Sequence, residues 1–207
     1  MHAGLIPLVG FTQGTTAVNL GHGDNGATRL SVPSGSSFGF SAVIHGVRSK
    51  GGEAALFHRQ GIIKNIGGAT SLTGSIQTIG TDINAGSASI AITADDTNDA
   101  LQIACTQPTG QFTGATGDAG TDVITLTGHP FANGDEICFS SLTGGTGLST
   151  GTRYFVRDVS GNTFKVTTGF AGNTAVNFTT NITDATVDFI WYWHAVLTVN
   201  RIDFALY

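Results

Sequence analysis

The chain of 207 residues holds 30 glycines, and only 11% of its residues are Asp, Glu, Lys or Arg. Soluble domains usually carry about 25% charged residues, so we expect part of this surface to be covered in an assembly. The formal net charge of −5 disfavours nucleic acid and anionic membranes as partners.

The N-terminus lacks the basic segment of a signal peptide, and no stretch approaches the ~20 apolar residues that cross a bilayer. We therefore expect a protein that is made in a cytoplasm and is soluble or assembled there. Short apolar runs alternate with Gly, Thr and Ser, and none shows sustained helical periodicity. This pattern predicts an all-β chain, long enough for one large or two small β-domains.

An apolar stretch lies close to the N-terminus, within a predicted segment of residues 1–30. It can act as an extended arm that docks on a neighbouring subunit, or as an edge strand of its own domain, and both interpretations stay open. Phe11 opens the first ordered piece. The arm interpretation assigns four residues to an interface: Leu5, Ile6, Leu8 and Val9.

A hairpin is predicted next, with strands at 32–48 and 54–64 around the Gly-Gly pair at 51–52. A two-glycine loop of type I′ fixes the register and places His45 opposite His58. One face belongs to the core, with Phe38, Phe40, Ala42, Ile44, Phe57 and Ile63. The other face is too apolar for water, so another sheet or subunit should cover it. The predicted interface takes from this hairpin Val43, His45, Val47, Leu56, His58 and Ile62.

Three shorter strands are predicted at 72–79, 88–94 and 101–105. In the last two, alternate apolar residues form one face, which is typical of half-buried strands. These faces hold Ala88, Ile90, Ile92 and Ala94 in one strand, and Leu101, Ile103 and Cys105 in the other. The polar run DDTND at 95–99 is the turn between them.

Composition changes after Cys105, where the Thr- and Gly-rich stretch 107–120 is predicted to be a linker. Short strands are expected near 123–127, 137–139, 154–156, 164–166 and 176–178. We expect residues 106–188 to form a small inserted β-domain, with 184–188 leading back to the first domain. That first domain then consists of residues 1–105, including the N-terminal arm, and residues 189–207.

The longest apolar run, Phe189 to Val199, is predicted to be a central strand. Its odd positions, which include both tryptophans, fill a core, while the even positions are covered or meet a partner. The even positions are Ile190, Tyr192, His194, Val196 and Thr198. The expected neighbour is the strand that ends near Cys105. After Val199 the buried positions are expected to become the even ones, Ile202, Phe204 and Leu206, and this change of phase predicts a β-bulge near Asn200 and Arg201.

Four stretches resemble the β-sandwich domains of phage structural proteins, which occur in tail fibres, other tail proteins and head decoration proteins. They read SFGFSAVIHGVRSKG, ALFHRQGIIK, SASIAITADDTNDALQIACT and WYWHAVLTVNRI. In that family the third stretch is followed closely by a Trp-containing strand, whereas here residues 106–188 intervene, which fits an insertion. The inserted stretch ITLTGHPFANGDEICFSSLTGGTGLSTGTRYFVRDVSGNTFKV resembles another phage-associated β-module.

The resemblance implies an antiparallel, jelly-roll-like β-sandwich with an inserted small β-module. It also implies a non-enzymatic virion protein without cofactors, assembled in the host bacterial cytoplasm. Because the sandwich begins without a long N-terminal shaft, a capsid decoration (cement) protein is favoured over a fibre tip. The expected partners are further copies of the chain, in a trimer, and the major capsid protein or another virion protein. The alternative is a tail-fibre adhesin that binds host-surface glycan.

Two groups of residues raise the question of a metal site. His45 and His58, as cross-strand neighbours, offer two ligands, but the sequence supplies no third or fourth, so we expect packing histidines. Asp95, Asp96 and Asp99 can bind Ca²⁺ through carboxylate oxygens, but a turn between two strands explains them equally well. No metal site is therefore predicted.

Three other groups raise the question of catalysis or binding. Asp135 and Glu136 have no opposing carboxylate of the kind that a glycosidase requires. The aromatic run at 191–193 can stack on sugar rings, but it lies in an apolar strand of which at least one row is core. Cys105 and Cys138 fall in different modules, so buried free thiols are expected rather than a disulfide. No catalytic residue is predicted.

Overall fold

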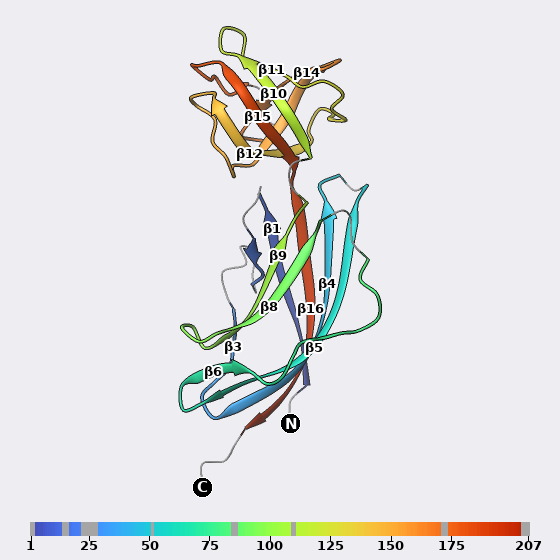
Figure 1. The fold of residues 1–207 in the computed structure, drawn as a ribbon, viewed down its shortest axis with the longest axis vertical. Helices are drawn as coiled ribbons and strands as arrows, with labels where there is room; N and C mark the ends of the chain where they lie inside the picture. Colours follow the sequence, from blue (N-terminus) through green and yellow to red (C-terminus); the bar gives the residue numbers. More distant parts are fainter. Residues whose placement is uncertain are drawn as a thin grey trace.

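The computed structural model describes residues 3–13, 17–21, 29–50, 52–83, 87–108, 111–170 and 174–203. Throughout these residues the chain is all-β: its strands pair antiparallel, and none of the described segments is helical. The strands form two open sheets and one closed six-stranded barrel (Figure 1). The predicted all-β class with antiparallel sheets is thereby confirmed.

The larger sheet has the strand order β1-β16-β4-β5-β6, with β7 beside β5. Its strands are β1 (Ala3–Thr12), β16 (Trp191–Asp203), β4 (Ser36–Arg48), β5 (Ala54–Ile66), β6 (Ala69–Leu72) and β7 (Gln77–Thr78). β16 is an interior strand, as predicted. Its neighbours, however, are β1 and β4, so the prediction that it pairs with the strand ending near Cys105 is wrong.

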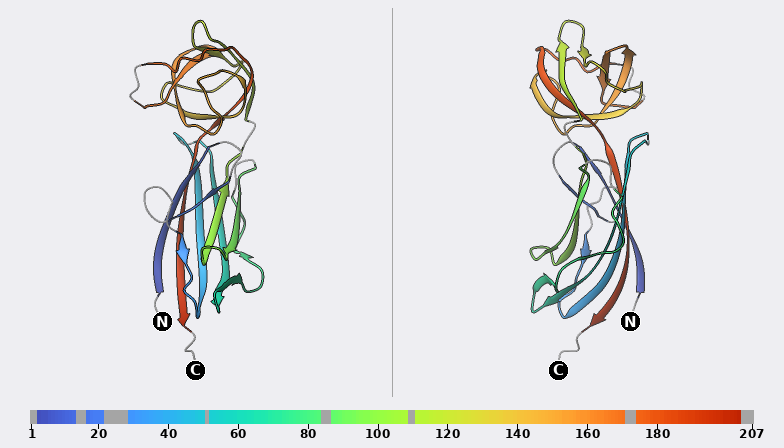
Figure 2. Two further views of the ribbon diagram at one scale, coloured as in Figure 1. Left: turned by 90° about the vertical axis from the view of Figure 1, so that its left-hand side faces the viewer. Right: turned by 45° about the vertical axis from the view of Figure 1, so that its right-hand side comes forward.

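The smaller sheet is built on β9, which pairs with three other strands. Its members are β2 (Val18–Asn19), β3 (Leu30–Ser31), β8 (Ser89–Asp95) and β9 (Ala100–Thr106). The predicted apolar faces of β8 and β9 both join one hydrophobic cluster with the larger sheet. Figure 2 shows β8 and β9, in green, lying beside the larger sheet. We call these two sheets together the two-sheet body.

The core of the two-sheet body is centred on Trp193, which is only 2% exposed. All six residues predicted for the core face of the hairpin are buried with it. The indole lies directly over Gly46, where a Cβ would overlap the ring. Its Nε1–H donates to Thr12 Oγ1 at 3.2 Å, so β1 satisfies the one polar atom of this side chain.

The β4–β5 hairpin has a register two residues away from the predicted one. His45 lies opposite Leu56, and His58 lies opposite Val43, so the predicted pairing of His45 with His58 is wrong. The last residue of β4 that pairs with β5 is Val47, because the closing loop is longer than two glycines. The shift is even, so every side chain stays on its predicted face.

The N-terminal apolar stretch is an edge strand and not an arm. Its pairing with β16 runs without a break from Ala3 to Thr12, and Phe11 lies inside it. The pairing of β16 with β4 is equally regular through Asn200 and Arg201, so the predicted bulge is wrong. The expected burial of even positions also fails at Ile202, which is 56% exposed; residues 204–207 lie outside the described part.

The chain between β9 and β16 forms the closed barrel, which is seen end-on in Figure 2. Its order around the barrel is β10-β11-β14-β13-β12-β15. The strands are β10 (Phe112–Asp118), β11 (Val123–Thr125), β12 (Glu136–Gly144), β13 (Tyr154–Ser160), β14 (Thr163–Thr167) and β15 (Ile182–Phe189). A second hydrophobic cluster fills it, separate from the core of the two-sheet body.

Three details of the barrel differ from the sequence prediction. β10 lies inside the stretch predicted as a linker. This strand is rich in glycine and threonine, so its sequence lacks the apolar residues that predict a strand. Residues 176–178 are not a strand, although Phe178 is buried in the barrel core. Residues 184–188 belong to β15, which pairs with both β10 and β12 and ends one residue beyond the predicted boundary.

Candidate functional site

The side of the larger sheet that faces away from the smaller sheet, here called the outer face, is the part of the surface on which the predicted interface residues converge. Cross-strand partners arrange it in rows that each take one residue from β1, β16, β4 and β5. One row joins Val9, His194, His45 and Leu56; the next joins Pro7, Val196, Val43 and His58; the third joins Leu5, Thr198, Ser41 and Gln60. None of these positions holds Asp, Glu, Lys or Arg.

Large apolar side chains on this face are open to solvent. Leu5 is 73% exposed, Val43 is 41% exposed and Ile62 is 45% exposed. Single exposed apolar residues are normal on proteins, but several of them on one uncharged face of a sheet are typical of a surface that meets a partner. The outer face therefore has the physical character that the sequence analysis predicts for the second face of the hairpin.

Two residues of the predicted interface lie elsewhere. Leu8 is 2% exposed and belongs to the core, and Ile6 packs against that core from the same side of β1. Strand alternation explains this, because Leu5, Pro7 and Val9 take the outer positions of β1 and Ile6 and Leu8 take the inner ones. The arm interpretation had placed all of the apolar residues of this stretch in an interface.

Three histidines lie on the outer face, but the pair that meets across strands is His45 and His194. His58 is held separately, with Nε2 2.8 Å from Ser41 Oγ. Among the residues that the structure describes, no three His, Cys, Asp or Glu side chains come close enough to hold a metal ion. Alternation along the sequence places His194 among the even positions of β16. That it lies opposite His45 depends on the register between β16 and β4, which the sequence alone does not give.

A shallow hollow of about 390 Å³ lies at the end of the outer face that is farther along β16 from the barrel. Gly39 and Gly61 line it together with Ile62 and Thr198. Gly39 lies opposite Ile62, and nothing lies within 4 Å of the place that its Cβ would take, so the missing side chain leaves room for the hollow. An apolar side chain from a partner can fill this hollow.

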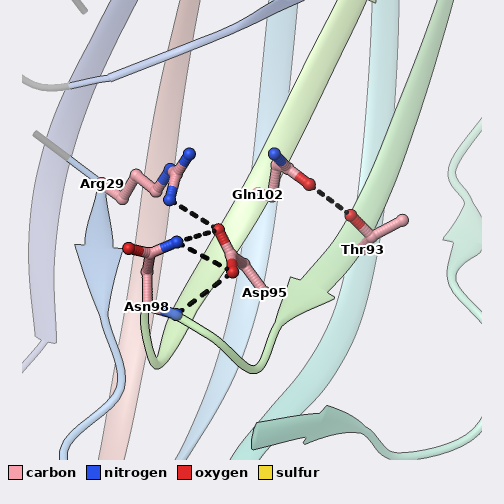
Figure 3. A network of polar contacts seen from close by, with 5 residues as sticks. All are labelled: Arg29, Thr93, Asp95, Asn98 and Gln102. Atoms are coloured by element: carbon pink, nitrogen blue, oxygen red, sulfur yellow. Dashed lines mark hydrogen bonds and ion pairs between the residues drawn. The ribbon is translucent and has the colours of Figure 1, made fainter. Parts of the chain in front are cut away.

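The DDTND turn is a structural turn in which each aspartate already has protein partners, and Figure 3 shows those of Asp95. Asp95 accepts hydrogen bonds from the backbone and side chain of Asn98, and Arg29 pairs with it at 2.6 Å. Asp96 and Asp99 accept from Thr70, which lies in the larger sheet. The bonds to Asn98 are the main reason that the pKa of Asp95 is lowered. The turn therefore connects the two sheets.

Asp135 and Glu136 act as links between the barrel and the two-sheet body. Asp135 pairs with Lys50 Nζ at 3.0 Å, and its other oxygen accepts from the backbone N–H of Ala132. Glu136 accepts a short hydrogen bond from the Tyr192 hydroxyl. Both carboxylates are thus engaged with side chains of the two-sheet body, and they do not face one another as a catalytic pair.

The bond between Tyr192 and Glu136 predicts a specific pH dependence. Burial first, and then the hydrogen bond to Glu136, raise the pKa of the Tyr192 phenol. The stabilisation from this group is therefore complete below the ordinary tyrosine pKa of about 10 and is lost as the pH rises through the folded-state value. In an alkaline titration followed by phenolate absorbance, Tyr192→Phe should remove a late phase, and Glu136→Gln should move that phase to lower pH. An unchanged titration in Glu136→Gln would contradict the coupling.

The tryptophans and cysteines are core residues. Trp191 and Trp193 are both buried and stack with ring centroids 5.8 Å apart, so they do not form an exposed sugar platform. Cys105 is a buried free thiol in the core of the two-sheet body, and Cys138 is buried on β12 of the barrel. Burial raises the pKa of the Cys105 thiol, which makes it a poor nucleophile.

Comparison of the chain with protein-family models, with curated proteins and with solved structures gave no match. Within the described residues, no helix has the length and apolar character required to traverse a membrane.

Proposed function

We propose that the protein is a non-enzymatic structural subunit of a bacteriophage particle, most simply a capsid decoration protein that forms a homotrimer on the head. The observation that carries the proposal is the outer face, where four strands present uncharged rows to solvent and where Leu5, Val43 and Ile62 are exposed. Burial of such a face contributes roughly 25 cal/mol per Å² of apolar area, which is a driving force for assembly that requires no catalytic group. The sequence resemblance to phage β-sandwich domains supports the same function.

The proposal includes a finer description of the fold. The two-sheet body, which β1 to β9 and β16 build, is an antiparallel, jelly-roll-like β-sandwich, and the chain between β9 and β16 is a guest β-domain. Two separate hydrophobic clusters support this division. In the particle, the outer face seals joints between neighbouring copies and the major capsid protein, and the barrel projects beyond the end of the sandwich.

The test compares the assembly of the purified chain with that of a variant carrying Val43→Lys and Ile62→Lys. Both side chains are more than 40% exposed, so the substitutions should change the free energy of unfolding by no more than about 0.5 kcal/mol. Two charges on each copy cannot be buried against the same face of another copy without a large desolvation cost. We expect trimers for the wild-type chain and monomers for the variant in sedimentation velocity over a wide concentration range.

Phe170→Lys is the matched control, because Phe170 is a large apolar side chain that is 73% exposed but lies on the barrel. It should leave the trimer intact. Electron microscopy of particles, with the chain located by a bound antibody fragment, then distinguishes head from tail. A wild-type chain that stays monomeric at high concentration and does not bind phage heads would contradict the proposal.

A further inference from the structure

A second hollow lies where the outer face meets the barrel. Its volume is about 530 Å³, within the range of about 300–1,000 Å³ that small-molecule sites occupy. β1, β4 and β16 supply most of its wall, and Arg153, just before β13, completes it from the barrel side. Neither unit forms this hollow alone, so its shape depends on the contacts that hold the barrel against the two-sheet body.

Arg153 is the one formally charged residue among those that line this hollow at neutral pH. Its guanidinium carbon lies 5.5 Å from the ring centroid of Phe11 and 5.4 Å from that of Phe155. Its Nη1 lies 3.4 Å from the Tyr192 hydroxyl, which itself donates to Glu136.

No described carboxylate forms an ion pair with Arg153. The aromatic rings and the phenol surround the guanidinium, and none of the carboxylates that the structure describes is its direct counter-ion. A guanidinium so placed has a fork of N–H donors that matches a carboxylate in geometry as well as charge.

The remaining walls combine flat apolar rings with imidazoles. Phe11, which is 37% exposed, and Tyr192 have ring centroids 6.2 Å apart and planes inclined by 43°. His45 and His194 line the same hollow and are direct cross-strand partners. Rings of this kind pack against C–H surfaces, and imidazoles donate to and accept from hydroxyl groups.

We propose that this hollow binds the acidic unit of a saccharide, such as a hexuronic acid, with Arg153 as the partner of its carboxylate. Phe11 and Tyr192 pack against the C–H face of the sugar ring, and His45 and His194 contact its hydroxyls. The charge selects acidic over neutral sugars, and the ring walls select a sugar over a simple carboxylate. Val9, His45 and His194 belong both to this hollow and to the first row of the outer face, so the saccharide site is open in a chain whose outer face is free of a partner.

The test is calorimetric titration of the full chain with glucuronate, with glucose as the neutral counterpart and acetate as the carboxylate without a ring. We expect glucuronate to bind and the other two to bind at least about tenfold more weakly, because each lacks one part of the recognition. Arg153→Gln should weaken glucuronate binding by about ten- to a hundredfold, the range expected for loss of a charged hydrogen-bond partner.

Arg157→Gln is the matched control, since this arginine lies on β13 with Asp158 as its ion-pair partner and does not line the hollow. It should bind glucuronate as the wild-type chain does. His194→Ala provides a second variant that keeps the cation and should weaken binding while leaving the preference for acid over neutral sugar. Thermal melting of each variant checks that the fold is retained. Equal binding of glucuronate and glucose, or of glucuronate and acetate, would overturn the proposal, as would wild-type affinity in Arg153→Gln.

Discussion

Replacing Trp193 by alanine is expected to lower the free energy of unfolding of the two-sheet body by about 3–5 kcal/mol. The side chain is 2% exposed, packs beside Trp191 and Phe57, and donates to Thr12. Its removal leaves a cavity in the middle of the core, and strands paired on both sides of β16 cannot collapse to fill it. Chemical denaturation followed by the fluorescence of Trp191 measures the loss, because both tryptophans belong to the two-sheet body and the barrel has none.

Two further variants make this prediction specific to the position. Thr198→Ala changes an exposed residue of the same strand and should alter the free energy of unfolding by less than about 0.5 kcal/mol. Gly46→Ala should destabilise the wild-type chain, because the added Cβ overlaps the indole of Trp193. In the Trp193→Ala background the same change should cost much less, because the overlap no longer exists. Additive effects of the two substitutions would show that the indole is not the obstacle.

Deleting residues 1–12 is expected to prevent the two-sheet body from folding to a soluble form. β1 covers one edge of β16 along its length, and it supplies Leu8 to the core and Thr12 to the Trp193 indole. Without β1, the backbone edge of an apolar strand is open to pairing with other chains, which is a common cause of aggregation. Expression of the truncated chain, with the soluble and insoluble fractions compared, measures the effect.

A pair of point substitutions separates a core strand from a docking arm. Leu8→Ala should cost about 2–5 kcal/mol because Leu8 is 2% exposed, whereas Leu5→Ala should cost less than about 0.5 kcal/mol because Leu5 is 73% exposed. Denaturation midpoints of the two variants provide the measurement. Similar small effects for both would favour the arm interpretation and would contradict the edge strand.

Side-chain alternation was readable from the sequence wherever one face of a strand is buried. The predicted core residues of β4, β5, β8 and β9, and those of β16 as far as Val199, all join the core or pack against it, because a period of two leaves a strong mark in apolar runs. β10 has no such mark: Ala115 is its one fully buried residue, and glycine and threonine occupy most of the rest. In the closed barrel, β11 and β15 pair with β10 through backbone hydrogen bonds, so β10 forms a strand without an apolar run of its own.

The residues of the candidate surfaces also fall into those that the sequence predicts and those that it does not. Val43, Leu56 and Ile62 could be assigned to one exposed face from alternation alone. The pairing of His45 with His194, and the approach of Arg153 to Phe11, could not be assigned in that way. Both join segments more than a hundred residues apart in the sequence, and nothing local in either segment encodes which strand will be its neighbour.

Local periodicity and the burial of apolar side chains are enough to predict the all-β class, the two faces of each strongly alternating strand and the two tryptophans as core. Only the tertiary structure decided that β1 and β4 flank β16, that the N-terminal stretch is an edge strand, and that the barrel closes through β10 and β15. The physical reason is that strand pairing is made by backbone hydrogen bonds, which are the same for every residue type. The choice among partners therefore depends on how the whole chain packs rather than on any one segment.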